Sequence, residues 1–201
     1  MSKAILACYK PRFVADILNW KKTVDLRKST PNEWLDYSFG LTEEQPQIDV
    51  YMYCTKSRKS SLSYSKRYGA HENIVGGKCM YSEIGDGCGK VVGKYTLKKV
   101  TSVREFMEFS YLNGEKIGGW EAVLLNNRHE IVLTEKELVE ATCMSVDEIR
   151  KYDKGNNWLS GWFISNVVAF DNPKELIEFR TGPYPEDVVV RAPMSWMYIE
   201  A

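Results

Sequence analysis

The 201-residue sequence has no excess of charge of either sign. Lys and Arg together number 27, Asp and Glu together number 27, and the formal net charge is zero. Proteins that coat long stretches of nucleic acid usually carry excess positive charge, because contacts with backbone phosphates dominate that affinity. The balance argues against a broad basic face, and it favours any nucleic-acid contact being local.

Long apolar runs are also missing. No run approaches the ~18 residues that a membrane helix needs. The apolar stretch that begins at Ala4 is too short for a signal peptide, and Lys10 interrupts it. We therefore expect a cytoplasmic protein with no membrane partner.

Metal and cofactor motifs are scarce as well. The odd number and irregular spacing of the cysteines favour reduced thiols over a disulfide framework or a zinc site. These five residues are Cys8, Cys54, Cys79, Cys88 and Cys143. The glycine-rich run 85–89 lacks the strand-to-helix context of a dinucleotide-binding loop. We expect no metal and no cofactor.

The sequence does contain enough apolar residues, 44%, for a sizeable core. Its length fits one domain, 1–201, with surface insertions near 55–89 and 104–132. The first of these insertions carries six of the 14 glycines. It is polar, so we expect a long surface segment there.

Apolar periodicity and turn signals predict the elements. Strands are expected at 4–8, 23–27, 48–54, 90–100, 162–170 and 195–199. Helices are expected at 11–20, 104–111 and 174–179, and after the capping boxes that begin at Thr134 and Ser145. Asn126-Asn127 is a possible hairpin turn, and Gly93 indicates a bulge or a close backbone approach. The pattern favours an α+β fold with a curved mixed sheet or β-barrel and short helices at its ends.

The segment 22–27 carries the chemistry of greatest interest. Alternation from Thr23 to Arg27 places Asp25 and Arg27 on one strand face, where a carboxylate and a guanidinium can pair. One interpretation is a surface ion pair that contributes ~0–1 kcal/mol. The other is a ligand site, in which Arg27 binds a phosphate, a carboxylate or a base edge and Asp25 orients it or accepts from a base amino group. Lys22 would then be a phosphate ligand or a general base.

Four motifs in this order resemble the ASCH family of the PUA-like superfamily, in its bacterial or phage type. The sequence from Trp20 to Arg27 is similar to the family's G-x-K-T-x-E-x-R signature, with Trp20 in place of the glycine and Asp25 in place of the glutamate. The other three motifs are Lys90–Thr96, which resembles a V-x-G strand, Gly161–Asn166 followed by Pro173–Leu176, and Pro193–Trp196.

The resemblance implies a PUA-like β-barrel with a cleft that faces RNA or a nucleotide-like ligand. It also leaves enzymatic activity open, since some family members hydrolyse N4-acetylcytidine and others are ribonucleases. The hydrolase's lysine corresponds to Lys22 and its threonine to Asp25, which is a poor substitute for a hydroxyl nucleophile. Its glutamate aligns near Glu135 or Glu137, and the alignment does not choose between them.

Three functions follow in order of preference. The first is a binding domain for RNA or a nucleoside-like ligand; the second is a small hydrolase that uses Lys22 and Asp25; the third is a protein-interaction domain without activity. Aromatic side chains at Tyr53, Trp158, Trp162 and Trp196 are either a stacking wall worth ~1–3 kcal/mol per base or core filling. Core filling is favoured for Trp196. The expected ligand-binding residues are Lys22, Asp25, Arg27, Trp162, Tyr53 and Lys10, and the oligomeric state is not determined.

Overall fold

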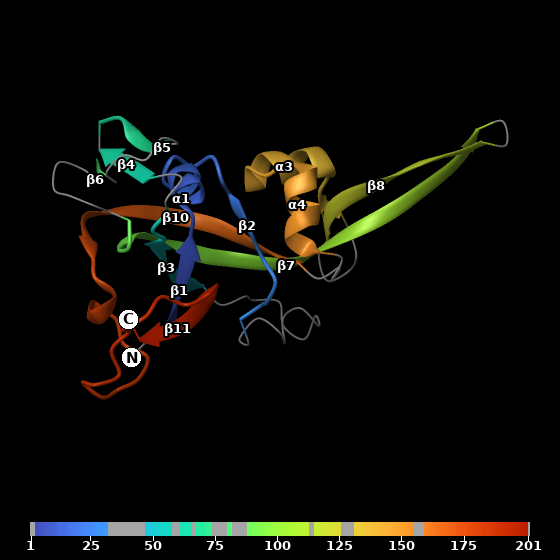
Figure 1. The fold of residues 1–201 in the computed structure, drawn as a ribbon. Helices are drawn as coiled ribbons and strands as arrows, with labels where there is room; N and C mark the ends of the chain where they lie inside the picture. The colour runs from blue at the N-terminus through green and yellow to red at the C-terminus, as the bar shows by residue number, and fades with distance from the viewer. Residues whose placement is uncertain are drawn as a thin grey trace. The chain divides into compact units, whose positions relative to one another are not determined.

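The computed structural model describes residues 3–31, 47–57, 61–65, 67–73, 80–81, 88–112, 115–125, 131–154 and 159–200. The chain forms two compact units, one of residues 1–22, 47–97 and 164–201 and one of residues 23–46 and 98–163. Strands β7 (Val91–Leu112) and β10 (Leu159–Lys174) each run through both units (Figure 1). That the whole chain is a single domain stays a prediction.

The first unit is built on strands β1 (Lys3–Tyr9), β3 (Ile48–Cys54) and β11 (Trp196–Glu200). Strand β1 pairs parallel with β3 and antiparallel with β11, while β3 pairs antiparallel with β7, so the sheet is mixed. Alternate residues of β3 are buried, as the period of two in its sequence predicts. Pairing of β1 with β11 brings the two ends of the chain side by side (Figure 1).

Helix α1 (Pro11–Leu18) follows β1 directly. Proline in the first turn has the backbone angle that a helix start requires, and Val14 and Ile17 are fully buried. The helix ends at Leu18, close to the predicted end at Trp20. Trp20 itself adopts the left-handed conformation, with φ of 59°. Glycine is the usual residue in that position after a helix, because a Cβ is disfavoured there.

The predicted insertion 55–89 contains a small sheet of β4 (Ser61–Ser65), β5 (Gly69–Asn73) and β6 (Met80–Tyr81). Helix α1 lies beside β4 and β5 (Figure 1). The side chain of Asn19 makes the contact: its Nδ2 donates to the carbonyl of Ala70 at 2.5 Å, and the Ala70 N–H donates to its Oδ1 at 2.9 Å. The side-chain amide of Asn19 thus bonds to both backbone groups of Ala70 on β5, as a neighbouring strand could.

The second unit contains β2 (Val24–Arg27), β8 (Glu115–Leu125), β9 (Ile131–Leu133), α3 (Glu135–Thr142) and α4 (Val146–Asp153). Its core joins the apolar face of β2 to both helices through Val24, Leu26, Leu138, Ile149 and Leu159. Thr134 and Ser145 cap the two helices with complete capping boxes, as predicted. None of the described helices is long and apolar enough to span a membrane.

The predicted helix 104–111 is wrong. These residues lie in β7, which pairs antiparallel with β8 from Ser102↔Leu125 to Leu112↔Glu115. In the sequence, the dipeptide Asn113-Gly114, which is typical of tight hairpins, stands between these two strands. Continuous cross-strand pairing outweighs a weak local helix preference. The suggested turn at 126–127 lies outside the described residues.

The predicted helix 174–179 is also wrong. Strand β10 continues to Lys174, and only a 3-10 turn, η2 (Leu176–Glu178), follows it. Its N-cap is Glu175 and not Asn172 as predicted. The Glu175 N–H donates to the Glu178 carboxylate at 2.7 Å. Asn-Pro is a turn signal as much as a helix start, and here the strand extends across it.

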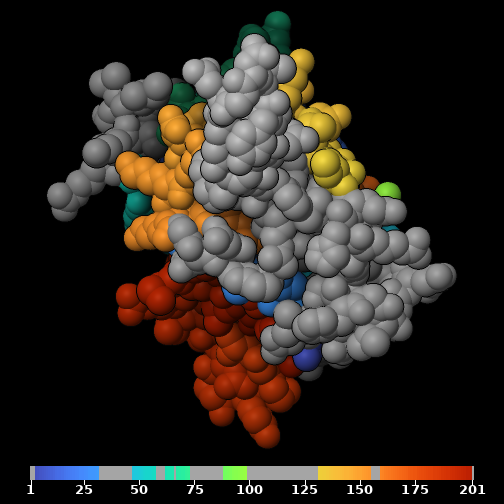
Figure 2. Space-filling view, turned by 90° about the vertical axis from the view of Figure 1, so that its right-hand side faces the viewer, coloured from blue at the N-terminus to red at the C-terminus, as the bar shows by residue number. Residues whose placement is uncertain are grey.

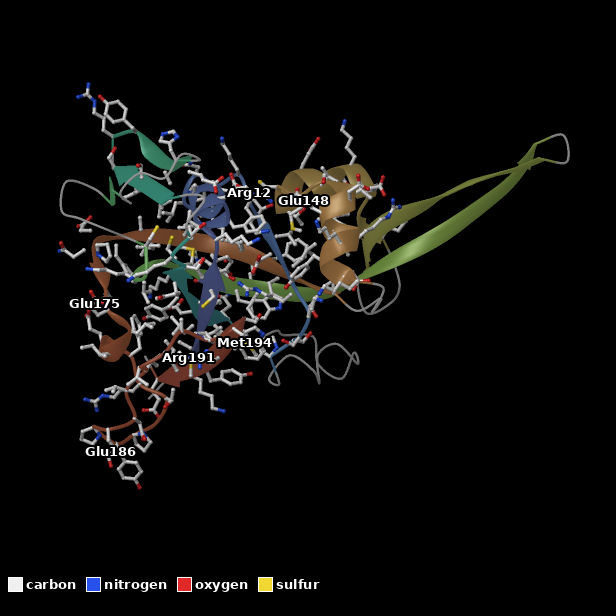
Figure 3. The ribbon with its side chains drawn as sticks, viewed as in Figure 1. Arg12, Glu148, Glu175, Glu186, Arg191 and Met194 are labelled. Atoms are coloured by element: carbon white, nitrogen blue, oxygen red, sulfur yellow. The ribbon has the colours of Figure 1, made fainter. Side chains whose placement is uncertain are left out.

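The C-terminal segment from Glu175 onward, red in Figure 2, contributes a lobe of the surface of the first unit. Figure 3 labels Glu175, Glu186, Arg191 and Met194 along this segment. Met194 is fully exposed, whereas Phe179 and Val189 are buried against the sheet. The segment is thus attached to the sheet by buried apolar side chains, by the bridge between Arg180 and Glu200 and by the pairing of β11 with β1.

Candidate functional site

Asp25 and Arg27 form a buried ion pair on β2. The Arg27 Nε donates to Asp25 Oδ2 at 2.6 Å, and only 6% and 8% of the two side chains are exposed. All four residues of β2 are buried, so the half-buried strand that alternation predicted has both faces covered. The interpretation as a surface ion pair is therefore wrong. The pair lies in an environment of low dielectric constant.

Trp162 is next to this pair. Strand β10 pairs antiparallel with β2 and places Trp162 opposite Asp25 and Ser160 opposite Arg27. The guanidinium carbon of Arg27 lies 5.6 Å from the centre of the Trp162 ring, within the range of a cation–π interaction. Trp162 is fully buried. Of the two alternatives, stacking wall and core filling, its position is that of core filling.

Tyr152 on α4 is a neighbour that the sequence interpretation missed. Burial raises the pKa of its hydroxyl; the nearby Arg27 charge lowers that pKa and the Asp25 charge raises it, so the phenol is electrostatically coupled to both members of the pair. The signal was available, because Tyr152 is three residues after the buried Ile149 and so lies on the same helix face. Asp25, Arg27, Tyr152 and Trp162 are called the Arg27 cluster below.

The cluster has two chemical consequences. A buried pair of opposite charges is stable only with close geometry, and removing one partner costs about 3–5 kcal/mol because the other charge stays desolvated. The hydrogen bond that Arg27 Nε donates to Asp25 also fixes the plane of the guanidinium. A guanidinium whose plane is fixed suits paired recognition of a phosphate or of a base edge.

Lys22 belongs to the first unit. It is 1% exposed, and its ammonium nitrogen lies 4.8 Å from the centre of the Phe13 ring. Its backbone N–H donates to the carbonyl of Asp16 at 3.0 Å. Burial raises the pKa of the Asp16 carboxyl above its usual value, although the charges of Arg12, Lys21 and Lys22 oppose that rise. A fully buried lysine is rare, and its role as a phosphate ligand or base stays a prediction.

The remaining predicted residues have other surroundings. Tyr53 is half-buried against the apolar cluster around Phe179 and Val189, and burial raises the pKa of its hydroxyl. Lys10 is exposed at the start of α1. Trp196 packs edge-on to Tyr198 with ring centres 5.4 Å apart, and Trp158 lies outside the described residues. The structure thus brings together Asp25, Arg27 and Trp162; binding by any of the predicted residues stays a prediction.

Metal ligands do not gather in the described ranges. Within these ranges no three His, Cys, Asp or Glu side chains are placed to hold one ion. The donors that the Arg27 cluster presents are a guanidinium and a phenol, which are suited to anions and polar ligands. The expectation that the protein uses no cofactor stays a prediction.

Comparison with known proteins gives one informative result. No family model matches the chain, and no curated protein matches it. The crystal structure of an ASCH protein from Zymomonas mobilis matches with a TM-score of 0.51 and 14% identity, over 98% of this chain and 87% of that one. The chain has the fold of an ASCH domain.

Two single-substitution variants of the same Zymomonas mobilis protein also match. Their TM-scores are 0.48 and 0.47, with 14% and 15% identity, over 98% and 99% of this chain and 88% and 91% of theirs. The α+β fold of an ASCH domain, predicted from four short motifs, is confirmed by the first of these structures, at a TM-score of 0.51. Among the described strands, six follow the order β11-β1-β3-β7-β10-β2, and β8 and β9 join this sheet beside β7.

Proposed function

We propose that this ASCH-fold protein is a binding domain that recognises RNA or a nucleoside-like ligand, and that the Arg27 cluster takes part in recognition. The observation that carries the proposal is the buried guanidinium of Arg27, held by Asp25 at 2.6 Å and placed 5.6 Å from the Trp162 ring. The fold comparison supports an ASCH-type protein and leaves the ligand open.

The chemistry of the cluster fits a nucleotide better than an apolar ligand. A guanidinium offers planar, paired donors to a phosphate or to the edge of a base. Because Asp25 already restrains Arg27, less rotational freedom is lost when a ligand binds. Positioning of this kind is what a specific, local contact requires in a protein with no net charge.

The competing interpretation is that the pair only stabilises β2. Arg27→Ala does not distinguish a binding role from a structural one, because loss of a buried partner can unfold the protein. Arg27→Lys keeps the positive charge and much of the side-chain length, but removes the planar fork. Arg191→Lys makes the same change at an exposed arginine of the C-terminal segment (Figure 3) and is the matched control.

The test is a thermal-shift titration of wild type and both variants with cytidine, N4-acetylcytidine, cytidine monophosphate and short single-stranded RNAs. A ligand at 100 times its Kd adds about 2.7 kcal/mol of stability to the wild type. We expect Arg27→Lys to fold but to bind at least tenfold more weakly, while Arg191→Lys binds as the wild type does. Equal ligand shifts in both variants would show that Arg27 is structural.

The hydrolase alternative depends on Lys22, whose full burial is its one structural support. The same panel tests it: release of acetate from N4-acetylcytidine by the wild type, lost in Lys22→Ala and retained in Lys21→Ala, would favour hydrolysis over binding. Lys21 is the exposed neighbour and so controls for charge. A folded wild type that neither binds nor hydrolyses any of these probes would favour the protein-interaction alternative.

A further inference from the structure

We propose that Cys54 and Cys88 are a modification site: a thiol pair that oxidises reversibly to a disulfide and closes the base of the segment 55–87. Their sulfur atoms lie 3.6 Å apart although 34 positions separate the residues in sequence. Both side chains are buried, Cys54 completely and Cys88 to all but 7%. Two thiols in van der Waals contact are at the distance from which a disulfide closes by a shift of about 1.5 Å.

The backbone around the two cysteines holds them in register. The Cys54 N–H donates to the carbonyl of Lys90 at 2.9 Å, and the Gly89 N–H donates to the carbonyl of Cys54 at 2.6 Å. Gly89 has φ of 88°, a conformation that a side chain disfavours, and this turn directs Cys88 back toward the end of β3. The thiol contact is therefore a product of strand pairing.

The pair is placed where the chain leaves the main sheet of the first unit and returns to it. Cys54 ends β3, and Cys88 lies three residues before β7 begins. The segment between them carries β4, β5 and β6, which reach α1 through Asn19 and Ala70. A covalent bond between Cys54 and Cys88 would join the two ends of this segment directly.

A neighbouring thiol has a different partner. Cys8 lies opposite Tyr53 on the adjacent strand, and its sulfur donates to the carbonyl of Pro193 at 2.9 Å. Burial raises the pKa of the Tyr53 hydroxyl, and negative charge on Cys8, Cys54, Glu175 or Cys88 raises it further. Contact between sulfur atoms, however, selects Cys54 and Cys88.

The oxidant is a small-molecule disulfide such as oxidised glutathione. The Cys88 thiolate, at the more accessible position, attacks one sulfur of that disulfide and releases one glutathione thiol. The Cys54 thiolate then attacks the Cys88 sulfur of the mixed disulfide and releases the second. Two protein thiols are oxidised, one small disulfide is reduced to two thiols, and the two protons pass to those thiols.

The test equilibrates the full-length protein with mixtures of reduced and oxidised glutathione, blocks remaining thiols and maps peptides by mass spectrometry. We expect a peptide pair that links Cys54 to Cys88, lighter by two hydrogens, and full reversal with excess reduced glutathione. Closure of a loop of this length should raise Tm by about 5–15 °C. Cys88→Ala should abolish both changes, and Cys143→Ala, at the C-cap of α3 in the other unit, should abolish neither.

Three outcomes overturn the proposal. They are a protein that keeps all its thiols in the most oxidising mixture, a stable mixed disulfide at Cys88 that Cys54 does not resolve, and a disulfide that uses Cys79 or Cys8 in place of Cys54. Because Cys54→Ala removes a fully buried side chain and can impair folding, the conclusion is drawn from Cys88→Ala and from the mapped peptides of the wild type.

Discussion

Asp25 and Arg27 are the two side chains whose environment differs most from that of an ordinary polar strand position. Their alternation with Val24 and Leu26 is typical of a strand with one wet face, yet both charges are more than nine-tenths buried. The bond from Arg27 Nε to Asp25 and the nearby Trp162 ring compensate part of the desolvation cost. Because the pair is buried, substitution of Arg27 should have a larger effect than substitution of an exposed arginine.

Gly93 is a second residue whose identity the structure requires. A Cβ built there would lie 2.5 Å from the carbonyl oxygen of Val168 and 3.3 Å from the Cα of Ala169. The β3–β7 register also shifts between Met52 and Tyr53, beside the same point. The predicted close approach is confirmed. Gly93→Ala should lower the free energy of unfolding by about 1–3 kcal/mol, because the added Cβ would force β7 and β10 apart at this point.

Urea unfolding of Gly93→Ala and Lys94→Ala checks this expectation. Lys94 is the next residue of β7, and its substitution removes a partly exposed ion pair with Asp49, 2.5 Å long, and a cation–π contact with the Tyr51 ring at 5.8 Å. Such pairs contribute at most about 1 kcal/mol. A Gly93→Ala variant no less stable than Lys94→Ala would contradict the close approach.

At the scale of elements, the helices of the second unit depend on their first turns. Thr134 and Glu137 cap α3 reciprocally: the Thr134 N–H donates to the Glu137 carboxylate at 2.9 Å, and the Glu137 N–H donates to the Thr134 hydroxyl at 3.5 Å. Ser145 and Glu148 do the same for α4. Both boxes are predictable from the sequence because all their partners lie within four consecutive residues.

The α3 box should weaken in acid. Hydrogen bonds from the backbone N–H and then the hydroxyl of Thr134 lower the pKa of the Glu137 carboxyl below its usual 4.5. A lowered pKa means that the stabilisation is complete above pH 4.5 and is lost as the pH falls through the lower folded-state value. Glu137→Gln keeps an acceptor but does not titrate in this range.

Thermal melts from about pH 6 to pH 3 measure this loss. The Tm of the wild type should fall more steeply with acid than that of Glu137→Gln. Glu135→Gln removes the same charge from the same turn without touching the box and should follow the wild type. Parallel curves for the wild type and Glu137→Gln would show that the box does not depend on ionisation.

At the scale of the whole molecule, charge balance limits how the protein can hold RNA. With 27 positive and 27 negative side chains there is no general attraction to phosphates, and a local site can neutralise only one or two of them. The logarithm of the binding constant should then fall with the logarithm of salt concentration with a slope of about −0.7 to −1.4.

Fluorescence anisotropy of a labelled short single-stranded RNA between about 50 and 200 mM salt measures the slope. A shallow slope in the wild type, nearly unchanged in Arg191→Lys, agrees with local recognition. A slope that corresponds to six or more phosphates would indicate a long basic track and would contradict the proposed mode of binding.

The amino-acid sequence by itself determined what depends on neighbours along the chain. The core strands, helix α1, both capping boxes and the close approach at Gly93 follow from periodicity and from the conformational preferences of proline, glycine and capping side chains. The order of four short motifs also predicted the ASCH fold that the structural comparison confirms. These signals are local, and local interactions are readable without the partner elements.

The tertiary structure decided what depends on contacts between distant segments. Long-range pairing with β8 made 104–111 a strand, and pairing with β10 buried the polar face of β2 together with Trp162. The thiol contact of Cys54 with Cys88 and the coupling of Tyr152 to Arg27 likewise join residues far apart in sequence. A strand's period shows which residues share a face, but only the neighbouring elements determine whether that face meets water.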